Sequence, residues 1–428
     1  MLDFSTRRLN RDADQLSTER KTTVQLPRTY PGGARIGQRE EDAVVEAIRS
    51  RRLFRYYGLV DGPSNVALFE TEVAAKLGSN RAIAVASGTA ALTASLAAIG
   101  AGPGDEVIVP AFAWMSTASC VLSVGAVPVV AEVDESLNID PLDLPNVINE
   151  RTKAIIAVNM RGAAADLDAI MAVANAHGIP VIEDNAQSMG GTFHGRPLGT
   201  LGTIGIFSLQ YNKTITSGEG GIVMSNDEAL IHRANMYHDV MATLRGVGST
   251  TVDAIVAQTL RMSELQGAVA RVQLTRLDGI VADAQRNQRA VIAGISERLA
   301  SSGVRLRVTP DPEGDIGICV VLLCANEEDA RTVVTSGVAD GLPAYRLYDE
   351  EKRDFHVAAH WDAVINRRWF SKVTPWDLHD GTVAYDDSRW GRSLGILGRA
   401  VHVELSPELN EEQIAFIVDG LNSALAKV

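Results

Sequence analysis

The chain has 428 residues, a formal net charge of −13 and a pI of about 5.2. Its length is enough for two domains, because single hydrophobic cores stop growing near roughly 250 to 300 residues. The acidic balance argues against nucleic acid as the main partner, since phosphate binding needs a basic face. It favours small metabolites as ligands.

Neither export nor membrane insertion is indicated. Residues 1–35 mix basic and acidic side chains without a continuous apolar segment, so we expect an N-terminal arm rather than a secretory signal. No stretch reaches the roughly 18 uninterrupted apolar residues of a membrane helix. The cysteines Cys120, Cys319 and Cys324 are odd in number and lack metal-ligand spacing, so neither a disulfide framework nor a metal site is expected. We therefore predict a cytoplasmic protein.

Residues 36–275 are predicted to form a large α/β domain. Two amphipathic helices are expected first, at 37–51 and 64–77. Short β-rich runs follow, each leading into helix-forming sequence or a turn, at 82–86, 107–110, 127–133, 154–158 and 181–183. Runs that are apolar on both faces indicate a mainly parallel sheet covered by helices. Ligands should gather beyond the carboxyl ends of its strands.

Residues 276–428 are predicted to form a smaller C-terminal α+β domain. A strand at 317–324, a helix from Asn326 onward and a terminal helix starting near Ser406 are expected. The segment 345–392 is rich in Trp, Asp and His but has no clear period, so no element is predicted there.

The loop RRLFRYYG at 51–58 leaves two interpretations open. Arg55, Tyr56 and Tyr57 either face a substrate or anchor the loop by burial.

Two strand ends carry candidate ligand-binding residues. Ser87, Gly88 and Thr89 lie at a strand-to-helix turn, where backbone N–H groups and hydroxyls can hold a phosphate; the alternative is a plain helix cap. Trp114, after the second strand, can stack on a planar ring; alternatively it belongs to the core.

Acid–base and covalent chemistry is indicated by two further stretches. In VIEDNAQSMGG, Asp184 can keep a pyridine nitrogen protonated and Gln187 can donate to a ring oxygen; the alternatives are a helix cap and a loop amide. In IFSLQYNKTITSGEGG, Lys213 follows Ser208 and precedes a glycine-rich turn. Such a lysine can bind a carbonyl cofactor covalently, whereas the alternative is a surface lysine.

A phosphate cradle, a stacking ring, a carboxylate and a lysine are together what pyridoxal 5′-phosphate (PLP) requires. The order of these motifs resembles that in the DegT/StrS-type family of PLP-dependent sugar aminotransferases. In this chain the motifs are SGTAAL, then Trp114, then EDNAQ, then FSLQYNK followed by GEGG. The resemblance covers residues 36–273 most strongly. It implies fold type I, the PLP-dependent transferase fold, with a mainly parallel seven-stranded sheet between helices and a smaller C-terminal domain.

The resemblance also implies a role for each motif residue. Lys213 corresponds to the lysine that binds the cofactor and then moves the substrate proton, and Asp184 to the partner of the ring nitrogen. Gln187 corresponds to the contact of the ring oxygen and Trp114 to the stacking ring. Gly88, Thr89 and Ser208 correspond to phosphate ligands.

Two positions depart from the family pattern. Thr259 stands where the family has an asparagine that reaches the neighbouring subunit's phosphate, although Arg261 still fits. Arg161 stands in a segment, Asn159 to Gly162, where the family shows a His-Leu-Tyr-Gly type sequence. An arginine there either binds a carboxylate of the amino donor or acceptor, or forms a surface ion pair.

The resemblance implies an aminotransferase that transfers an amino group from L-glutamate or L-glutamine to a keto sugar, nucleotide keto sugar or keto cyclitol. The setting would be amino-sugar or aminocyclitol biosynthesis, for an envelope or an antibiotic, and the assembly a homodimer with shared active sites. Two alternatives remain: a sugar dehydratase of the same family, in which a histidine replaces the lysine, and a non-catalytic regulator.

Overall fold

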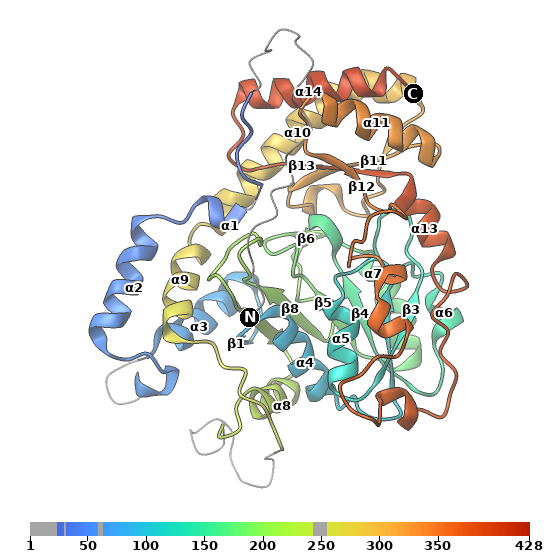
Figure 1. Cartoon of the computed structure of the whole chain (residues 1–428). Coiled ribbons are helices and arrows are strands. Elements are labelled where there is room, and N and C mark those ends of the chain that lie inside the picture. The colour runs from blue at the N-terminus through green and yellow to red at the C-terminus, as the bar shows by residue number, and fades with distance from the viewer. Residues whose placement is uncertain (1–23, 30, 59–62, 243–254) are drawn as a thin grey trace, which may run out of the picture.

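The computed structural model describes residues 24–29, 31–58, 63–242 and 255–428. Two sheets, of seven and of four strands, form the framework of this part of the chain (Figure 1). A two-stranded ribbon joins β6 (Thr192–Phe193) and β7 (Arg196–Pro197).

The larger sheet has the strand order β1-β9-β8-β5-β4-β2-β3. Strands β3, β2, β4, β5 and β8 run parallel, whereas β9 is antiparallel to both β8 and β1. The predicted seven-stranded, mainly parallel sheet is thereby confirmed. Its strands are β1 (Arg81–Val85), β2 (Glu106–Pro110), β3 (Val127–Ala131), β4 (Thr152–Val158), β5 (Val181–Asp184), β8 (Ile204–Ser208) and β9 (Gly221–Ser225).

Helices cover both faces of this sheet because its strands are apolar on both sides. On β9, Val223 packs in the cluster that contains α4 (Gly88–Ile99) and α8 (Glu228–His238). Its neighbours Ile222 and Met224 pack in the opposite cluster with α3 (Asn65–Leu77) and α9 (Glu264–Leu274). The period of two along a strand explains this division. The other helices of this part are α1 (Pro31–Ala34), α2 (Gln38–Ser50), α5 (Ser116–Ser123), α6 (Leu144–Val147) and α7 (Leu167–His177).

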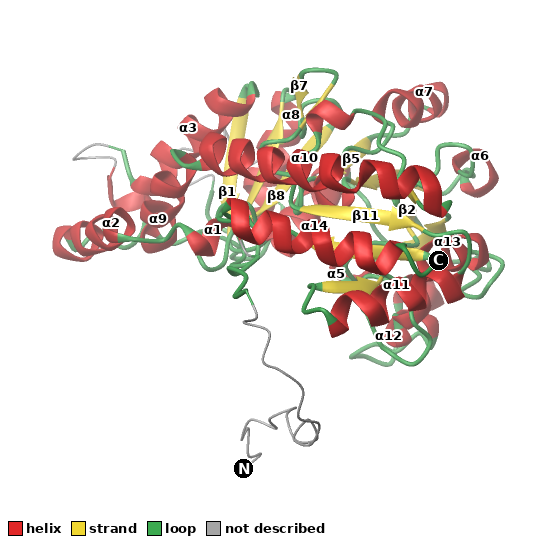
Figure 2. Cartoon of the chain, turned by 90° about the horizontal axis from the view of Figure 1, so that it is seen from above, coloured by secondary structure: helices red, strands yellow, loops and turns green. Residues whose placement is uncertain are grey.

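The smaller sheet is antiparallel, in the order β10-β11-β13-β12. Helices α10 and α14 lie side by side over one of its faces (Figure 2), where Val320 and Leu322 of β11 join their apolar residues. The elements are β10 (Arg305–Leu306), β11 (Cys319–Leu323), β12 (Ala344–Arg346), β13 (Ala400–Glu404), α10 (Leu277–Ser302), α11 (Glu327–Ala339), α12 (Asp362–Ile365), α13 (Gly391–Gly398) and α14 (Glu411–Leu425).

The terminal helix begins later than predicted, so its expected start near Ser406 is wrong. Asn410 caps α14: its side chain accepts the N–H of Gln413 at 2.9 Å, and the Gln413 side chain accepts the N–H of Asn410 at 3.0 Å. This reciprocal capping box satisfies two backbone donors at once, which a serine ahead of Pro407 does not offer.

The segment 345–392, for which no element was predicted, packs against the larger sheet. Trp361, Trp376 and Trp390 are all buried in the same apolar cluster as strands β2, β3 and β4. The N–H of Ala113 donates to the carbonyl of His356 at 2.8 Å, which fixes the segment beside the end of β2. Single tryptophan anchors and isolated backbone bonds hold it, so it shows no hydrophobic period.

The proposed division at residues 275 and 276 falls between α9 and α10 and stays a prediction. Cys319, Val321 and Leu323 on the second face of β11 belong to the cluster of the larger sheet, so the two sheets share apolar contacts. None of the helices in the described part of the chain combines the length and apolar character that crossing a bilayer requires.

Candidate active site

A cavity of about 720 Å³ lies at the carboxyl ends of β1, β4, β5 and β8. This is where open α/β sheets bind ligands. Every site residue predicted from the sequence lines it, namely Gly88, Thr89, Trp114, Asp184, Gln187, Ser208 and Lys213. Residues more than 120 positions apart in the sequence are thus brought to one place.

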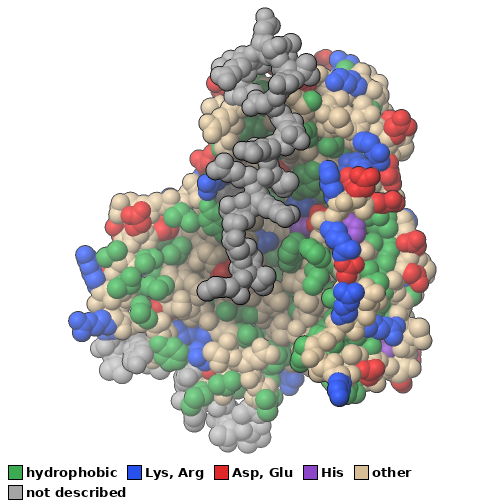
Figure 3. Space-filling view, in the orientation of Figure 1, with side chains coloured by type: hydrophobic (Ala, Val, Ile, Leu, Met, Phe, Trp, Pro, Cys, Tyr) green, Lys and Arg blue, Asp and Glu red, His purple; other side chains and the backbone are tan. Residues whose placement is uncertain are grey.

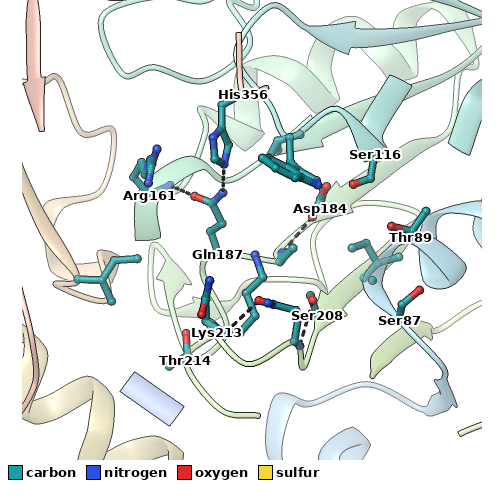
Figure 4. A pocket seen from close by; sticks show the side chains of 18 of the residues that line it. Ser87, Thr89, Ser116, Arg161, Asp184, Gln187, Ser208, Lys213, Thr214 and His356 are labelled. Carbon is teal, nitrogen blue, oxygen red and sulfur yellow. Dashed lines mark hydrogen bonds between the residues drawn. The ribbon is translucent and has the colours of Figure 1, made fainter. Parts of the chain in front are cut away.

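One end of the cavity has the features of an anion cradle. It is built on the first turn of α4, whose leading N–H groups have no partner within the helix. Ser87 caps α4, accepting the N–H of Ala90 at 3.0 Å, so the cap interpretation holds for Ser87 itself. The hydroxyls of Ser87, Thr89 and Ser208 lie on the same side of the cavity (Figure 4).

Glycines allow three elements to meet at this cradle. A Cβ on Gly88 would lie 2.9 Å from the Cβ of Ser208, so glycine lets α4 approach β8. A Cβ on Gly221 would lie only 2.2 Å from the carbonyl oxygen of Ser87. The last glycine of GEGG is therefore required by the close passage of β9 under the turn that starts α4.

Lys213 lies in the loop after β8, and its backbone is held by two bonds. Its N–H donates to the carbonyl of Gln210 at 3.0 Å, and its carbonyl accepts the N–H of Gly32 at 3.1 Å. Burial lowers the pKa of the Lys213 amine, the charge of Asp184 opposes that shift, and the charge of Arg161 adds to it. A lowered pKa makes the amine more readily neutral and nucleophilic, unlike that of a surface lysine.

Asp184, at the end of β5, is buried beside this amine. Burial raises the pKa of its carboxyl group. The N–H of Ala186, at 3.0 Å, the charge of Lys213 and the hydroxyl of Thr117 favour the ionised form and oppose that shift. The carboxylate thus has donors that hold it in position, and it faces a cavity in which a cationic ring nitrogen would be a strong partner.

Gln187 belongs to a chain of hydrogen bonds. Its Oε1 accepts the N–H of Arg161 at 3.1 Å, and its Nε2 lies 3.4 Å from Nε2 of His356. Nδ1 of His356 lies 2.7 Å from the Asp354 carboxylate. Because a carboxylate accepts, Nδ1 carries the proton, and Nε2 of His356 accepts from Gln187. The amide keeps a second N–H for a ligand.

The surroundings of His356 favour its neutral form. Burial lowers its pKa, and the hydrogen bond to Asp354 only partly opposes that shift. For Asp354, burial acts to raise the pKa, but the bonds from His356 and nearby positive charge lower it on balance. The sequence analysis missed both residues because they lie in the segment without a period.

Trp114 is 50% exposed and lies at the side of the cavity, so the alternative that places it in the core is wrong. Its ring centroid lies 4.9 Å from that of His356 and 6.4 Å from that of Phe355. A half-exposed indole that lines a cavity is available for stacking on a planar ligand.

The smaller sheet contributes three cavity residues that sequence reasoning missed. Tyr345 on β12 pairs with His402 on β13, and Glu404 follows two positions later on the same face. Val401 and Val403 point the other way, into the cluster of α10 and α14. The alternation in AVHVE was the available signal, since polar residues at period two mark the face away from the helices.

Two other stretches lie away from the cavity. Arg55 forms an ion pair with Glu70 at 2.6 Å, and neither it nor Tyr56 or Tyr57 lines the cavity of this chain, which favours the anchoring interpretation. Thr259 is exposed, whereas Arg261 pairs with Asp239 at 2.7 Å.

Residues 35–359 match the sequence profile of the DegT/DnrJ/EryC1/StrS aminotransferase family. The chain is 35% identical over 281 residues to the L-glutamine:2-deoxy-scyllo-inosose aminotransferase of Streptoalloteichus tenebrarius. The aligned region covers 63% of this chain and 64% of that protein. It is 35% identical over 286 residues to the GDP-perosamine synthase of Caulobacter vibrioides, covering 66% of this chain and 72% of that protein. The match to the inosose aminotransferase thus spans less than two thirds of its length.

Among solved structures, the chain is similar to 3-amino-5-hydroxybenzoic acid synthase, with a TM-score of 0.76 and 26% identity. That likeness covers 94% of this chain and all of the other chain.

Proposed function

Because the chain belongs to the DegT/DnrJ/EryC1/StrS aminotransferase family, we propose that it is a PLP-dependent aminotransferase. The observation that carries the proposal is the partly buried amine of Lys213, with its lowered pKa, in one cavity with an anion cradle and the carboxylate of Asp184. This combination suits a carbonyl cofactor that also bears a phosphate.

The residues fit PLP at each of its functional groups. The α4 N-terminus with Thr89 and Ser208 would hold the phosphate, and the absent Cβ of Gly88 leaves α4 close to Ser208. Trp114 would cover the ring, and Gln187 would donate its second N–H to the ring oxygen. When bound, PLP supplies an electron sink for the carbon that gains or loses the amino group.

The protein's own residues then have separate tasks. Asp184 would keep the ring nitrogen of bound PLP protonated, because a carboxylate stabilises a cation beside it. The amine of Lys213 takes the proton from the substrate carbon in one half of the reaction and returns one in the other. Two hydrogen bonds fix the orientation of Gln187: its amide donates to His356 and accepts the N–H of Arg161.

The proposed amino donor is L-glutamine or L-glutamate, and the proposed acceptor is a keto cyclitol, a keto sugar or a nucleotide keto sugar. The relatives support these classes by their names, which specify L-glutamine with an inosose and a GDP-linked amino sugar. The product would enter amino-sugar or aminocyclitol biosynthesis. The dehydratase alternative is disfavoured by Lys213, since the resemblance places a histidine there in dehydratases.

The visible spectrum of the PLP-loaded protein tests this function. We expect its yellow colour to fade on addition of L-glutamine or L-glutamate alone and to return on addition of a keto cyclitol or keto sugar. A colour that no amino donor changes would favour the dehydratase or the regulator. A protein that takes up no PLP would contradict the proposal.

Replacing Gly221 by alanine should weaken PLP binding. The added Cβ would collide with the Ser87 carbonyl and shift the start of α4, and such overpacking costs about 1–3 kcal/mol. This corresponds to a roughly 5- to 150-fold higher dissociation constant if the strain falls on the bound form. Titration with PLP, followed by absorbance, measures it.

Gly395→Ala is the matched control, because a Cβ there would meet no atom within 4 Å. Equal PLP affinity in both variants would show that the anion cradle does not require glycine at position 221.

We also propose a homodimer and retain the cytoplasmic location as a prediction. Ile36, Val45, Ile48 and Leu53 are exposed apolar side chains on or beside α2. Figure 3 shows apolar side chains gathered on the lobe where Figure 1 places α2. Such a patch is typical of a protein interface. Sedimentation equilibrium distinguishes a dimer from a monomer.

A further inference from the structure

Arg161 lies on a backbone turn that is strained and firmly held. It follows β4 in a short turn, Met160–Gly162, with φ of 55° and ψ of 37°, the left-handed region that side chains disfavour. A non-glycine residue persists there only when its surroundings fix it, and such residues cluster at functional sites.

Three hydrogen bonds to two side chains fix this turn. The N–H of Arg161 donates to Gln187, and the carbonyls of Met160 and Arg161 accept from the guanidinium of Arg307 at 3.1 and 3.0 Å. Arg307 is itself paired with Asp315 at 2.8 Å, and both side chains are about 95% buried. The position of Arg161 is therefore determined by a buried ion pair rather than by its own side chain.

The side chain of Arg161 enters the cavity and forms no ion pair with a described residue. Its guanidinium carbon lies 6.0 Å from the ring centroid of Phe112 and 5.9 Å from that of Tyr345. Its Nε is buried and has no hydrogen-bond partner in the part of the chain that the structure describes. Among the described residues no carboxylate forms an ion pair with it, and the carboxylate of Asp354 is engaged by His356. The surface ion pair considered from the sequence is therefore wrong.

The nearby charge of Asp354 and the two aromatic rings stabilise the guanidinium only in part, because none of them forms an ion pair with it. A cation in a partly desolvated cavity gains most when a ligand supplies the paired anion. The phosphate cradle does not meet this need, because its hydroxyls lie on the other side of Lys213 from Arg161 (Figure 4). A second anionic group is thus expected, close enough to Lys213 for the Arg161 charge to lower the pKa of that amine.

We propose that Arg161 binds the α-carboxylate of the amino donor. This inference rests on the proposed aminotransferase function. In an amino acid the carboxylate and the amine share one carbon, so an arginine beside Lys213 places that carbon at the reacting centre. The planar guanidinium matches a carboxylate with two parallel hydrogen bonds. A keto cyclitol and a keto sugar carry no anionic group, and the diphosphate of a nucleotide keto sugar is attached away from the keto carbon. An arginine beside Lys213 therefore acts in the donor half of the reaction.

Binding of glutaramate tests the proposal. This compound is glutamine without its α-amino group, so it keeps the carboxylate but cannot react. Calorimetric titration of the PLP-loaded protein should show binding that Arg161→Gln weakens about 10- to 100-fold, as expected for a charged hydrogen-bonded pair. Arg161→Lys keeps the positive charge but not the planar guanidinium that forms two parallel hydrogen bonds, so it should lose less affinity for glutaramate than Arg161→Gln. Arg289→Gln, which removes an exposed arginine paired with Glu313, should bind as the wild type.

A second measurement identifies the source of the carboxylate. The probe is 4-aminobutanamide, which is glutamine without its carboxylate. L-Glutamine should bleach the wild type far faster than 4-aminobutanamide does. In Arg161→Gln the ratio of the two bleaching rates should be smaller. Glutaramate that binds equally to wild type and Arg161→Gln, or not at all to the wild type, overturns the proposal. So does a variant impaired only with the keto acceptor. If glutaramate binding depends on Arg161 but no donor bleaches the protein, the carboxylate site stands and the proposed aminotransferase function fails.

Discussion

Replacing Lys213 by alanine is expected to abolish amino transfer while leaving the fold intact. The variant loses both the amine that binds the cofactor and the base that moves the substrate proton. Base catalysis alone contributes about 10²- to 10⁴-fold, so we expect a loss of at least about 10⁴-fold in kcat. Steady-state turnover with L-glutamine and a keto cyclitol measures it, with circular dichroism to check folding.

Added methylamine gives this prediction a sharper readout. A small amine can occupy the space of the lost side chain and restore part of the proton transfer in Lys213→Ala. Lys213→Arg should stay inactive even so, because its guanidinium remains protonated and fills the space. Lys352→Ala, which removes a lysine that is 84% exposed, should retain full activity. Turnover by Lys213→Ala near the wild-type level would exclude Lys213 from catalysis.

Replacing Asp184 by asparagine is expected to give the second largest loss, about 10²- to 10⁴-fold in kcat. The amide has nearly the size of the carboxylate, so the fold should persist. It lacks the charge that keeps the ring nitrogen protonated, and a neutral ring withdraws electrons poorly. Single-turnover bleaching by L-glutamine isolates this step from acceptor binding.

Asp227→Asn is the matched control for that substitution. Asp227 caps α8 by accepting the N–H groups of Ala229 and Leu230, and asparagine caps helices about as well. Its bleaching rate should equal that of the wild type. A bleaching rate of Asp184→Asn similar to that of the wild type would show that protonation of the ring nitrogen does not depend on this carboxylate.

The residues that could be assigned from the sequence share one property. Ser87, Asp184 and Lys213 each follow a short apolar run, and the ends of parallel strands meet at one edge of a sheet. The order of the motifs therefore predicted their meeting in one cavity. Strand runs that are apolar on both faces also predicted a mainly parallel sheet covered by helices.

Other parts of the cavity could not be assigned in this way. His356 and Asp354 lie in a segment held by tryptophan anchors, which leaves no periodic pattern to interpret. His402 and Glu404 come from a second sheet, and their approach to Lys213 depends on how the two sheets pack. The start of α14 was predicted at the wrong position because several polar residues in this stretch can cap a helix. The hydrogen bonds between Asn410 and Gln413, which only the structure shows, determine where the helix begins.

By itself, the sequence determined an α/β fold with a mainly parallel sheet, the cofactor class indicated by the motifs, and the residues that meet at the strand ends, whereas the number of seven strands was implied by the family resemblance. These features depend on local order and on periodicity, which a chain carries along its length. The tertiary structure alone decided the surroundings of Arg161. Whether an arginine has a counter-ion depends on side chains distant in sequence, here Phe112, Tyr345, Arg307 and Asp354. No sequence pattern encodes the absence of a partner, so that property appears only when the packing is known.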